Sequence, residues 1–331
     1  MQQARASAGT AGVVRTTLHN LAFQDVAALL FHGYLALRVM AAPDSPDATF
    51  ARRFAVALWL ITATTLALTR GEVLRPGRLR ALVYRLGLFT PIPLSYFLLR
   101  SLLPALQPEL VDAQLWAIDR ALFGVTPAEW LDRLNSPGFI EWFSFFYYSY
   151  FYLTAAMLIP PLFLDRGLRL QQLMLGGLTV AAIGHCTYTL VPGLGPYSVL
   201  DLEPIRGGFF WQQVITTVQS AGAQLDIFPS LHTAYPVFFA LHAFGWRHTR
   251  PYTYLWPVVA FIAANIIVAT MLLRWHWGID VIAGLCLATL ARFVAVKLSA
   301  REANRGDRQP VWEPIADPIA EDPETAKVAP T

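Results

Sequence analysis

Residues 251–298 read PYTYLWPVVAFIAANIIVATMLLRWHWGIDVIAGLCLATLARFVAVKL, and they decide the fold class of this chain. They form two apolar runs, 251–273 and 278–298, which a short segment containing Arg274 and His276 joins. A helix needs about 20 mostly apolar residues to cross a bilayer. Each run therefore predicts one membrane-spanning helix, and the joining segment is expected at a membrane surface.

Further apolar windows extend this prediction over most of the chain. Hydrophobic residues make up 55% of the 331 residues and charged residues 14%, where soluble globular proteins carry about 25% charged residues. A soluble single-core protein could not bury that much apolar surface. We therefore expect an all-α polytopic membrane helix bundle with eight spanning helices. Six further windows precede the quoted stretch. The first begins after residue 19, and the other five lie near 54–69, 81–104, 139–164, 170–192 and 228–246.

Charge and cysteine content narrow the possible functions. The net charge of +3 is too small and too scattered to indicate a nucleic-acid partner. The two cysteines, Cys186 and Cys286, both lie inside apolar runs, so the sequence predicts neither a disulfide framework nor a cysteine metal site. We expect no cofactor and no metal ion, and the oligomeric state stays open.

Arginines in the short connections predict the orientation, because cytoplasmic loops of membrane proteins are enriched in Lys and Arg. If eight helices are counted, the arginine-rich connections all fall on one side, which we assign to the cytoplasm together with both termini. The expected location is the plasma (inner) membrane. Arg52 and Arg53 oppose this assignment, so the first two helices are its weakest part. The arginine-rich segments are 70–80, 165–169, 246–250 and the start of the C-terminal tail.

The expected domain organisation follows from these segments. Residues 1–19 form a cytoplasmic segment, 20–80 the N-terminal membrane helices, 81–298 the catalytic membrane domain, and 299–331 a disordered cytoplasmic tail. Residues 105–138 are acidic and carry Trp116 and Trp130 at amphipathic spacing, which indicates helices lying in the outer interface.

Ionisable residues at the ends of the predicted helices mark a candidate site, because such groups inside a membrane are functional by default. Ser230 is expected to cap the helix that begins after Pro229, with His232 in its first turn. His276 and Asp280 are four residues apart, so they share one helix face. The fifth predicted helix ends on the same outer side, close to Gly195.

This constellation predicts chemistry on a phosphoryl group. An imidazole beside a carboxylate has a fixed tautomer and a supported positive charge, so we assign His276 as nucleophile and Asp280 as its orienting group. His232, at a helix terminus rich in free N–H groups, would protonate the leaving oxygen. A His-x-x-x-Asp pair or a Pro-Ser helix start is by itself ordinary structure, and only their joint placement favours catalysis.

The segments Phe228-Pro229-Ser230-Leu231-His232 and His276-x-x-x-Asp280 resemble two motifs of the type 2 phosphatidic acid phosphatase (PAP2) superfamily. Within it the chain is most similar to the inositol phosphorylceramide synthase and sphingomyelin synthase-like branch, with support from the 119–124 segment, Thr270 and Gly195. The resemblance covers about residues 81–298. It implies a six-helix core, a phosphohistidine intermediate and no metal.

The chain departs from the phosphatases of that superfamily in its arginines. It lacks their Lys-x6-Arg-Pro motif and has Ala269-Thr270 where they have Ser-Arg. We therefore assign phosphate binding to Arg274 first and to Arg206 second, with Ser230 and Gly195 as further substrate-binding candidates.

Three functions remain in view. The leading one is a membrane lipid phosphotransferase, whose partners are a lipid donor and a small alcohol or lipid acceptor. A lipid phosphatase uses the same chemistry with water as acceptor, and a non-enzymatic channel or transporter is the third. Transfer requires a cover that excludes water, which we assign to the 105–138 segment and to the 193–210 loop. The aromatic run 147–152 is assigned to packing rather than to a lipid cleft.

Overall fold

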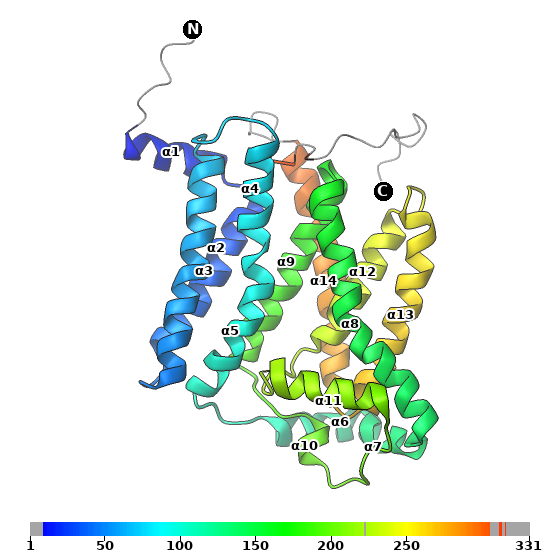
Figure 1. Ribbon diagram of the computed structural model, residues 1–331. Coiled ribbons are helices and arrows are strands. Elements are labelled where there is room, and N and C mark those ends of the chain that lie inside the picture. Colours follow the sequence, from blue (N-terminus) through cyan, green and yellow to red (C-terminus); the bar gives the residue numbers. More distant parts are fainter. Residues whose placement is uncertain (1–8, 222, 305–310, 313–314, 316–331) are drawn as a thin grey trace.

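Helices account for the architecture of the computed structural model, which describes residues 9–221, 223–304, 311–312 and 315 (Figure 1). No strand occurs among these described residues. The prediction of an all-α polytopic bundle is confirmed. The helices are α1 (Thr10–Asn20), α2 (Phe23–Met40), α3 (Pro46–Arg70), α4 (Arg78–Phe89), α5 (Pro91–Ala105), α6 (Asp112–Phe123), α7 (Pro127–Leu131) with a 3₁₀ turn (Asp132–Leu134), α8 (Pro137–Leu164), α9 (Gly167–Tyr188), α10 (Pro196–Val199), α11 (Phe209–Ala221), α12 (Leu231–Gly245), α13 (Tyr252–Leu272) and α14 (Gly278–Ala303).

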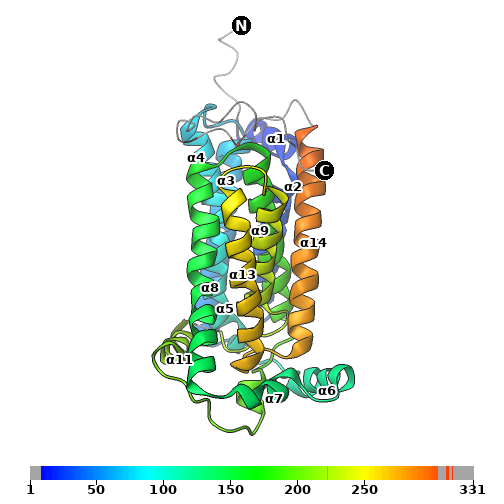
Figure 2. The same ribbon diagram turned by 90° about the vertical axis from the view of Figure 1, so that its right-hand side faces the viewer.

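The long helices run roughly parallel to one another, as both views of the bundle show (Figures 1 and 2). Within the described part of the chain, four spans are long and apolar enough to cross a membrane: α3, α4 with α5, α13 and α14. Helix α1 and the end of α14 lie at one end of the bundle. Helices α6, α7, α10 and α11 lie across the opposite end, which we call the site end (Figures 1 and 2).

Two boundaries differ from the sequence prediction. The window 81–104 forms α4 and α5, which meet at Thr90, because Pro91 and Pro93 lack the N–H groups that would continue an uninterrupted helix. The 193–210 segment, predicted as a loop, contains helix α10 and leads into helix α11, which begins at Phe209. The aromatic residues in the N-terminal half of α11 made the amphipathic pattern of this short helix difficult to recognise in the sequence.

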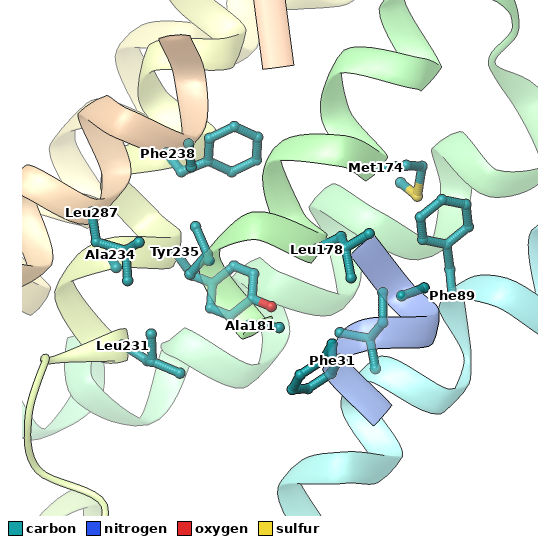
Figure 3. Packing of buried hydrophobic residues seen from close by; sticks show 14 of the residues in the cluster. Phe31, Phe89, Met174, Leu178, Ala181, Leu231, Ala234, Tyr235, Phe238 and Leu287 are labelled. Atoms are coloured by element: carbon teal, nitrogen blue, oxygen red, sulfur yellow. The ribbon is translucent and has the colours of Figure 1, made fainter. Parts of the chain in front are cut away.

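A hydrophobic core joins the N-terminal helices to the rest of the bundle. Phe31 of α2, Phe89 of α4, Leu178 of α9 and Phe238 of α12 belong to one cluster of buried side chains (Figure 3). Phe238 is 0% exposed, and Gly176 lets its ring approach, because a Cβ added to the glycine would lie 2.1 Å from the ring. Small residues at helix crossings allow such close packing in membrane bundles.

The described part of the predicted tail, which starts at residue 299, has a definite structure. Helix α14 continues to Ala303, and Val311 is 1% exposed. Trp312 packs edge-on against Tyr84, with ring centroids 5.4 Å apart. Most of the remaining tail lies outside the described residues, as does the start of the 1–19 segment.

Candidate active site

Helix α12 begins at the site end with a side-chain cap. Ser230 is fully buried, and its Oγ accepts a hydrogen bond from the Thr233 N–H at 3.2 Å. The Ser230 N–H donates to the Asp280 carbonyl oxygen at 3.0 Å. The cap therefore also fixes the start of α12 against α14, which brings His232 and Asp280 to the same place.

His276 and Asp280 form the pair that their spacing predicts. The His276 Nδ1 lies 3.5 Å from the Asp280 Oδ2, an ion-pair distance that exceeds an ordinary hydrogen bond. Both side chains are buried, at 4% and 0% exposure. The same Oδ2 accepts the Trp277 N–H at 2.9 Å, which holds the carboxylate in place. Catalytic contacts of this kind are often long before substrate binds.

The second histidine lies across from the first. The ring centroids of His232 and His276 are 6.0 Å apart, and the two rings are tilted by 49°. Tyr147 of α8 stacks on His232 at 4.4 Å with an interplanar angle of 11°, and the Tyr150 ring centroid lies 4.1 Å away. Tyr147 and Tyr150 of the aromatic run thus pack against His232, but Tyr147, Tyr148 and Phe151 also line the cavity beside the two histidines, which the prediction of packing alone missed. The His232 Nε2 is buried with no hydrogen-bond partner in the described structure, so it is available to a ligand.

Both imidazoles line one cavity of about 220 Å³ at the site end. Its walls come from segments that are far apart in the chain: Tyr96 of α5, Tyr147 of α8, Val218 of α11 and Leu194 in the loop before α10. A space of this size holds several waters or a small headgroup. The two histidines that the sequence analysis joins in one catalytic constellation therefore line the same cavity.

Helix α6 connects the two loops that flank this cavity, a role that the sequence reasoning missed. The Asp119 carboxylate accepts the Gly278 and Ile279 N–H groups, each at 2.8 Å, and so caps the start of α14. Asp112 accepts the Leu194 N–H at 2.8 Å and the Trp277 Nε1–H at 3.2 Å. From the sequence, acidic residues in an amphipathic interfacial helix are expected to face solvent. Only their burial in the structure shows that they hold distant segments by hydrogen bonds.

Gly195 has a structural reason for its identity. Its φ of +80° lies in the left-handed region, and an added Cβ would lie 2.5 Å from the Trp275 carbonyl oxygen. Its N–H donates to Asp112 at 2.9 Å. The glycine thus lets the 193–197 loop pass directly beside the segment that carries His276. Ser230 likewise caps a helix and does not line the cavity.

The two arginines assigned to phosphate binding lie elsewhere. The Arg274 guanidinium forms an ion pair with Asp132 and donates to the Glu203 carbonyl oxygen at 2.7 Å. Arg206 is exposed, and its described contact is a backbone hydrogen bond to Asn135. Neither side chain is among the described residues that line the cavity. Arg274 lies two residues before His276 in the sequence, but its φ is +62° and its guanidinium pairs with Asp132 in the 3₁₀ turn after α7. Its position outside the cavity therefore could not be predicted from its distance to His276 along the chain.

The sequence reasoning also missed an acidic residue in the cavity. Asp226, in the loop before α12, lines the cavity together with His232 and His276. The Tyr96 hydroxyl lies close to its carboxylate. Burial raises the pKa of the Asp226 carboxyl above its ordinary value. The position of this carboxylate just before the Phe228–His232 motif is the sequence feature that could have indicated its place in the site.

The charge of the cavity is therefore unusual for a phosphate site. None of the described residues that line it is Lys or Arg. Among the residues that the structure describes, no group of three His, Cys, Asp or Glu side chains is placed to hold a metal ion. Among the described lining residues, the two imidazoles are the groups that can meet a phosphoryl group with positive charge.

Comparisons with known proteins identify the family of the chain. A family model described as the PAP2 superfamily matches residues 113–294, more than half of the chain. An uncharacterized protein of Methanocaldococcus jannaschii is 31% identical over 123 residues, which are 37% of this chain and 44% of that protein. The matched stretch thus spans less than half of that relative. No solved structure matches significantly.

Proposed function

Because the chain belongs to the PAP2 superfamily, we propose that it is an integral-membrane lipid phosphotransferase that acts through His276. Membership supports a lipid enzyme of the phosphatase or phosphotransferase type in general. The observation that carries the proposal is the pairing of His232 and His276 across one cavity, with ring centroids 6.0 Å apart and Asp280 behind His276.

The first half-reaction follows from this arrangement. The Nδ1–H tautomer of His276 faces Asp280, so Nε2 is the free nucleophile. Nε2 attacks the phosphorus atom of a lipid phosphoester, forming an N–P bond while the P–O bond to the leaving group breaks. His232, in its protonated form, gives its proton to the leaving oxygen. Asp280 stabilises the positive charge on the phosphohistidine ring.

The second half-reaction reverses these roles. The oxygen of an acceptor alcohol attacks the phosphorus atom, and the N–P bond breaks to release His276. The now neutral His232 accepts the hydroxyl proton, which restores both histidines to their starting forms. The product is an alcohol esterified with the transferred phosphoryl or phosphoryl-headgroup unit. An inositol phosphorylceramide synthase-like reaction is one example of this scheme.

Hydrolysis by the same site is the second candidate, because water can replace the alcohol. The position of α11 favours transfer: Val214, Ile215 and Val218 face the cavity and present apolar surface over the histidines. Excluding water protects a phosphohistidine until an alcohol binds. This apolar wall comes from α11 and the 194–198 segment, rather than from Trp116 and Trp130, which do not line the cavity.

Mass analysis of lipid products tests the proposal. Purified protein is incubated with a labelled phospholipid donor and a series of alcohols, with and without EDTA. We expect an alcohol to compete with water far beyond its molar share, and activity to survive EDTA. His276→Ala should abolish turnover and the acid-labile phosphoenzyme, whereas free phosphate as the dominant product at every alcohol concentration would favour the phosphatase.

Orientation completes the proposal. We place the site end at the outer face of the inner membrane and both termini in the cytoplasm. The support is the charge asymmetry: the connections with Arg166, Arg247 and Arg250, and the start of α9 with Arg169, lie at the end opposite the cavity (Figure 1).

A further inference from the structure

Asp226 has no role in the two half-reactions, although it lines the same cavity as the two histidines. A carboxylate close to a bound phosphoryl anion raises the free energy of that complex through like-charge repulsion. No Lys or Arg among the described lining residues offsets this repulsion. A positive charge carried by the substrate itself would offset it.

The walls of the cavity also suit a cation. Six of its described lining residues are aromatic: Tyr96, Tyr147, Tyr148, Phe151, Tyr197 and Trp275. Tyr197 and Trp275 stack with centroids 4.8 Å apart and so present a continuous ring surface. Aromatic faces attract ammonium groups, most strongly where water is excluded, and a carboxylate beside them adds a direct charge partner.

The Asp226 carboxylate is held for such contact. It lies in the short segment between α11 and α12, with the Tyr96 hydroxyl of α5 close to it. Because the residue is half-buried and part of the cavity wall, a ligand can reach it while the side chain stays in position. The carboxylate and the two imidazoles therefore line one cavity, so that a single small ligand can contact all three.

We propose that Asp226 and the surrounding aromatic rings form a subsite for an ammonium-bearing headgroup, so that the enzyme acts on amino-alcohol phosphoesters. This proposal rests on the proposed function for the identity of the reaction, and it names the substrate class. The ammonium group can belong to the headgroup of the donor lipid or to the acceptor alcohol. In both cases the phosphoryl group lies between His232 and His276 and the cation lies against Asp226.

Matched substrates distinguish the two sources. In the donor arm, phosphatidylethanolamine is compared with phosphatidylglycerol of the same acyl chains, with one fixed neutral alcohol as acceptor. In the acceptor arm, ethanolamine is compared with ethylene glycol, with one fixed donor. The wild-type protein should prefer the ammonium compound in the arm that corresponds to the natural source.

Asp226→Asn removes the charge and keeps a hydrogen-bond acceptor for Tyr96. We expect kcat/KM for the ammonium substrate to fall by about tenfold or more, while kcat/KM for its neutral counterpart changes little. Asp226→Glu should retain the preference. Asp201→Asn, which removes the same charge from an exposed position in the neighbouring loop, is the control and should leave the preference unchanged.

Binding without turnover separates this proposal from the proposed function. Calorimetry on His276→Ala compares phosphoethanolamine with 2-hydroxyethyl phosphate, which differ only in the ammonium group. Tighter binding of phosphoethanolamine that Asp226→Asn abolishes would support the subsite even if no transfer occurs. Equal binding of both compounds, or equal losses for charged and neutral substrates in Asp226→Asn, would overturn it, even where transfer itself is observed.

Discussion

At the scale of single residues, Asp280 does two things with one carboxylate oxygen. Its Oδ2 accepts the Trp277 N–H at 2.9 Å and lies 3.5 Å from the His276 Nδ1. The first contact fixes the carboxylate, and the second orients the imidazole. Because the side chain is fully buried, its charge acts on His276 with little screening by water.

Asp280→Asn separates these two contributions. The amide oxygen can still accept the Trp277 N–H, but the negative charge that supports a cationic imidazole is lost. We expect kcat to fall by about 10²–10⁴-fold with little change in KM. Steady-state kinetics on the purified variant measure this, and circular dichroism verifies that the bundle is intact. An unchanged kcat would assign Asp280 a purely structural function.

At the scale of elements, α6 holds the site together from outside the bundle. Asp119 caps the start of α14, and Asp112 holds the Leu194–Gly195 turn. The helix itself is short, and few of its side chains are buried. Its effect on the cavity therefore depends on a small number of charge-assisted hydrogen bonds.

Asp119→Asn tests this connection. An amide can accept only one of the two N–H groups at the start of α14 and places a donor against the other. We expect a loss of about 1–3 kcal/mol in the free energy of unfolding, together with a lower kcat, because His276 precedes this helix directly. Thermal unfolding in detergent and turnover are measured side by side. Asp44→Asn is the control, because Asp44 is exposed in its ion pair with Arg52. We expect it to change neither the free energy of unfolding nor kcat.

Helix α11 is the second element that decides how the site behaves. Its N-terminus is tied to α8, where the Glu141 carboxylate accepts the Gly208 and Trp211 N–H groups at 2.8 and 3.0 Å. One side of the helix lines the cavity. This attachment makes α11 a fixed apolar wall beside the two histidines.

Val218→Ala should therefore change product partition rather than chemistry. Removing two methyl groups from the cavity wall admits water, so we expect the ratio of hydrolysis to transfer to rise while phosphoenzyme formation stays near its wild-type rate. Product analysis with a labelled donor gives the ratio. Thr216→Ala, on the exposed side of the same helix, provides the comparison, and an identical ratio in both variants would argue against a water-excluding function for α11.

At the scale of the whole molecule, the site depends on which end of the bundle faces outward. The cavity lies at the end that carries α6, α7, α10 and α11, and the arginine-rich connections lie at the other (Figures 1 and 2). Positive charges near membrane helices remain preferentially in the cytoplasm. We therefore expect donor and acceptor to reach the site from the outer face.

Cysteine labelling tests this orientation. In a background with Cys186→Ala and Cys286→Ala, Asp201→Cys should react with a membrane-impermeant maleimide in intact cells, and His248→Cys only after lysis. Both positions are exposed in the structure, so a lack of reaction reflects topology and not burial. Reaction of Asp201→Cys only after lysis would reverse the proposed orientation and place the substrates in the cytoplasm.

The sequence by itself determined the fold class and the central pair of the site. Apolar windows of membrane-spanning length dictate helices, because backbone N–H and C=O groups in lipid must be satisfied within the segment. The spacing of His276 and Asp280 fixes their common face through the helical period, and Ser230 caps α12 because its side chain competes locally for a free N–H. These features depend only on residues that are near one another in the chain.

Tertiary structure alone decided which distant polar groups share the cavity. Arg274, two residues from His276, pairs with Asp132, whereas Asp226 lies with both histidines although it was not distinguished in the sequence. The sequence pattern predicts that Asp112 and Asp119 lie on a solvated interfacial face. In the structure they accept hydrogen bonds from segments that are far away in the chain. Such partners follow from how the helices pack, because a side chain's neighbours across an interface depend on the relative rotation and depth of two elements. No local pattern encodes that relation.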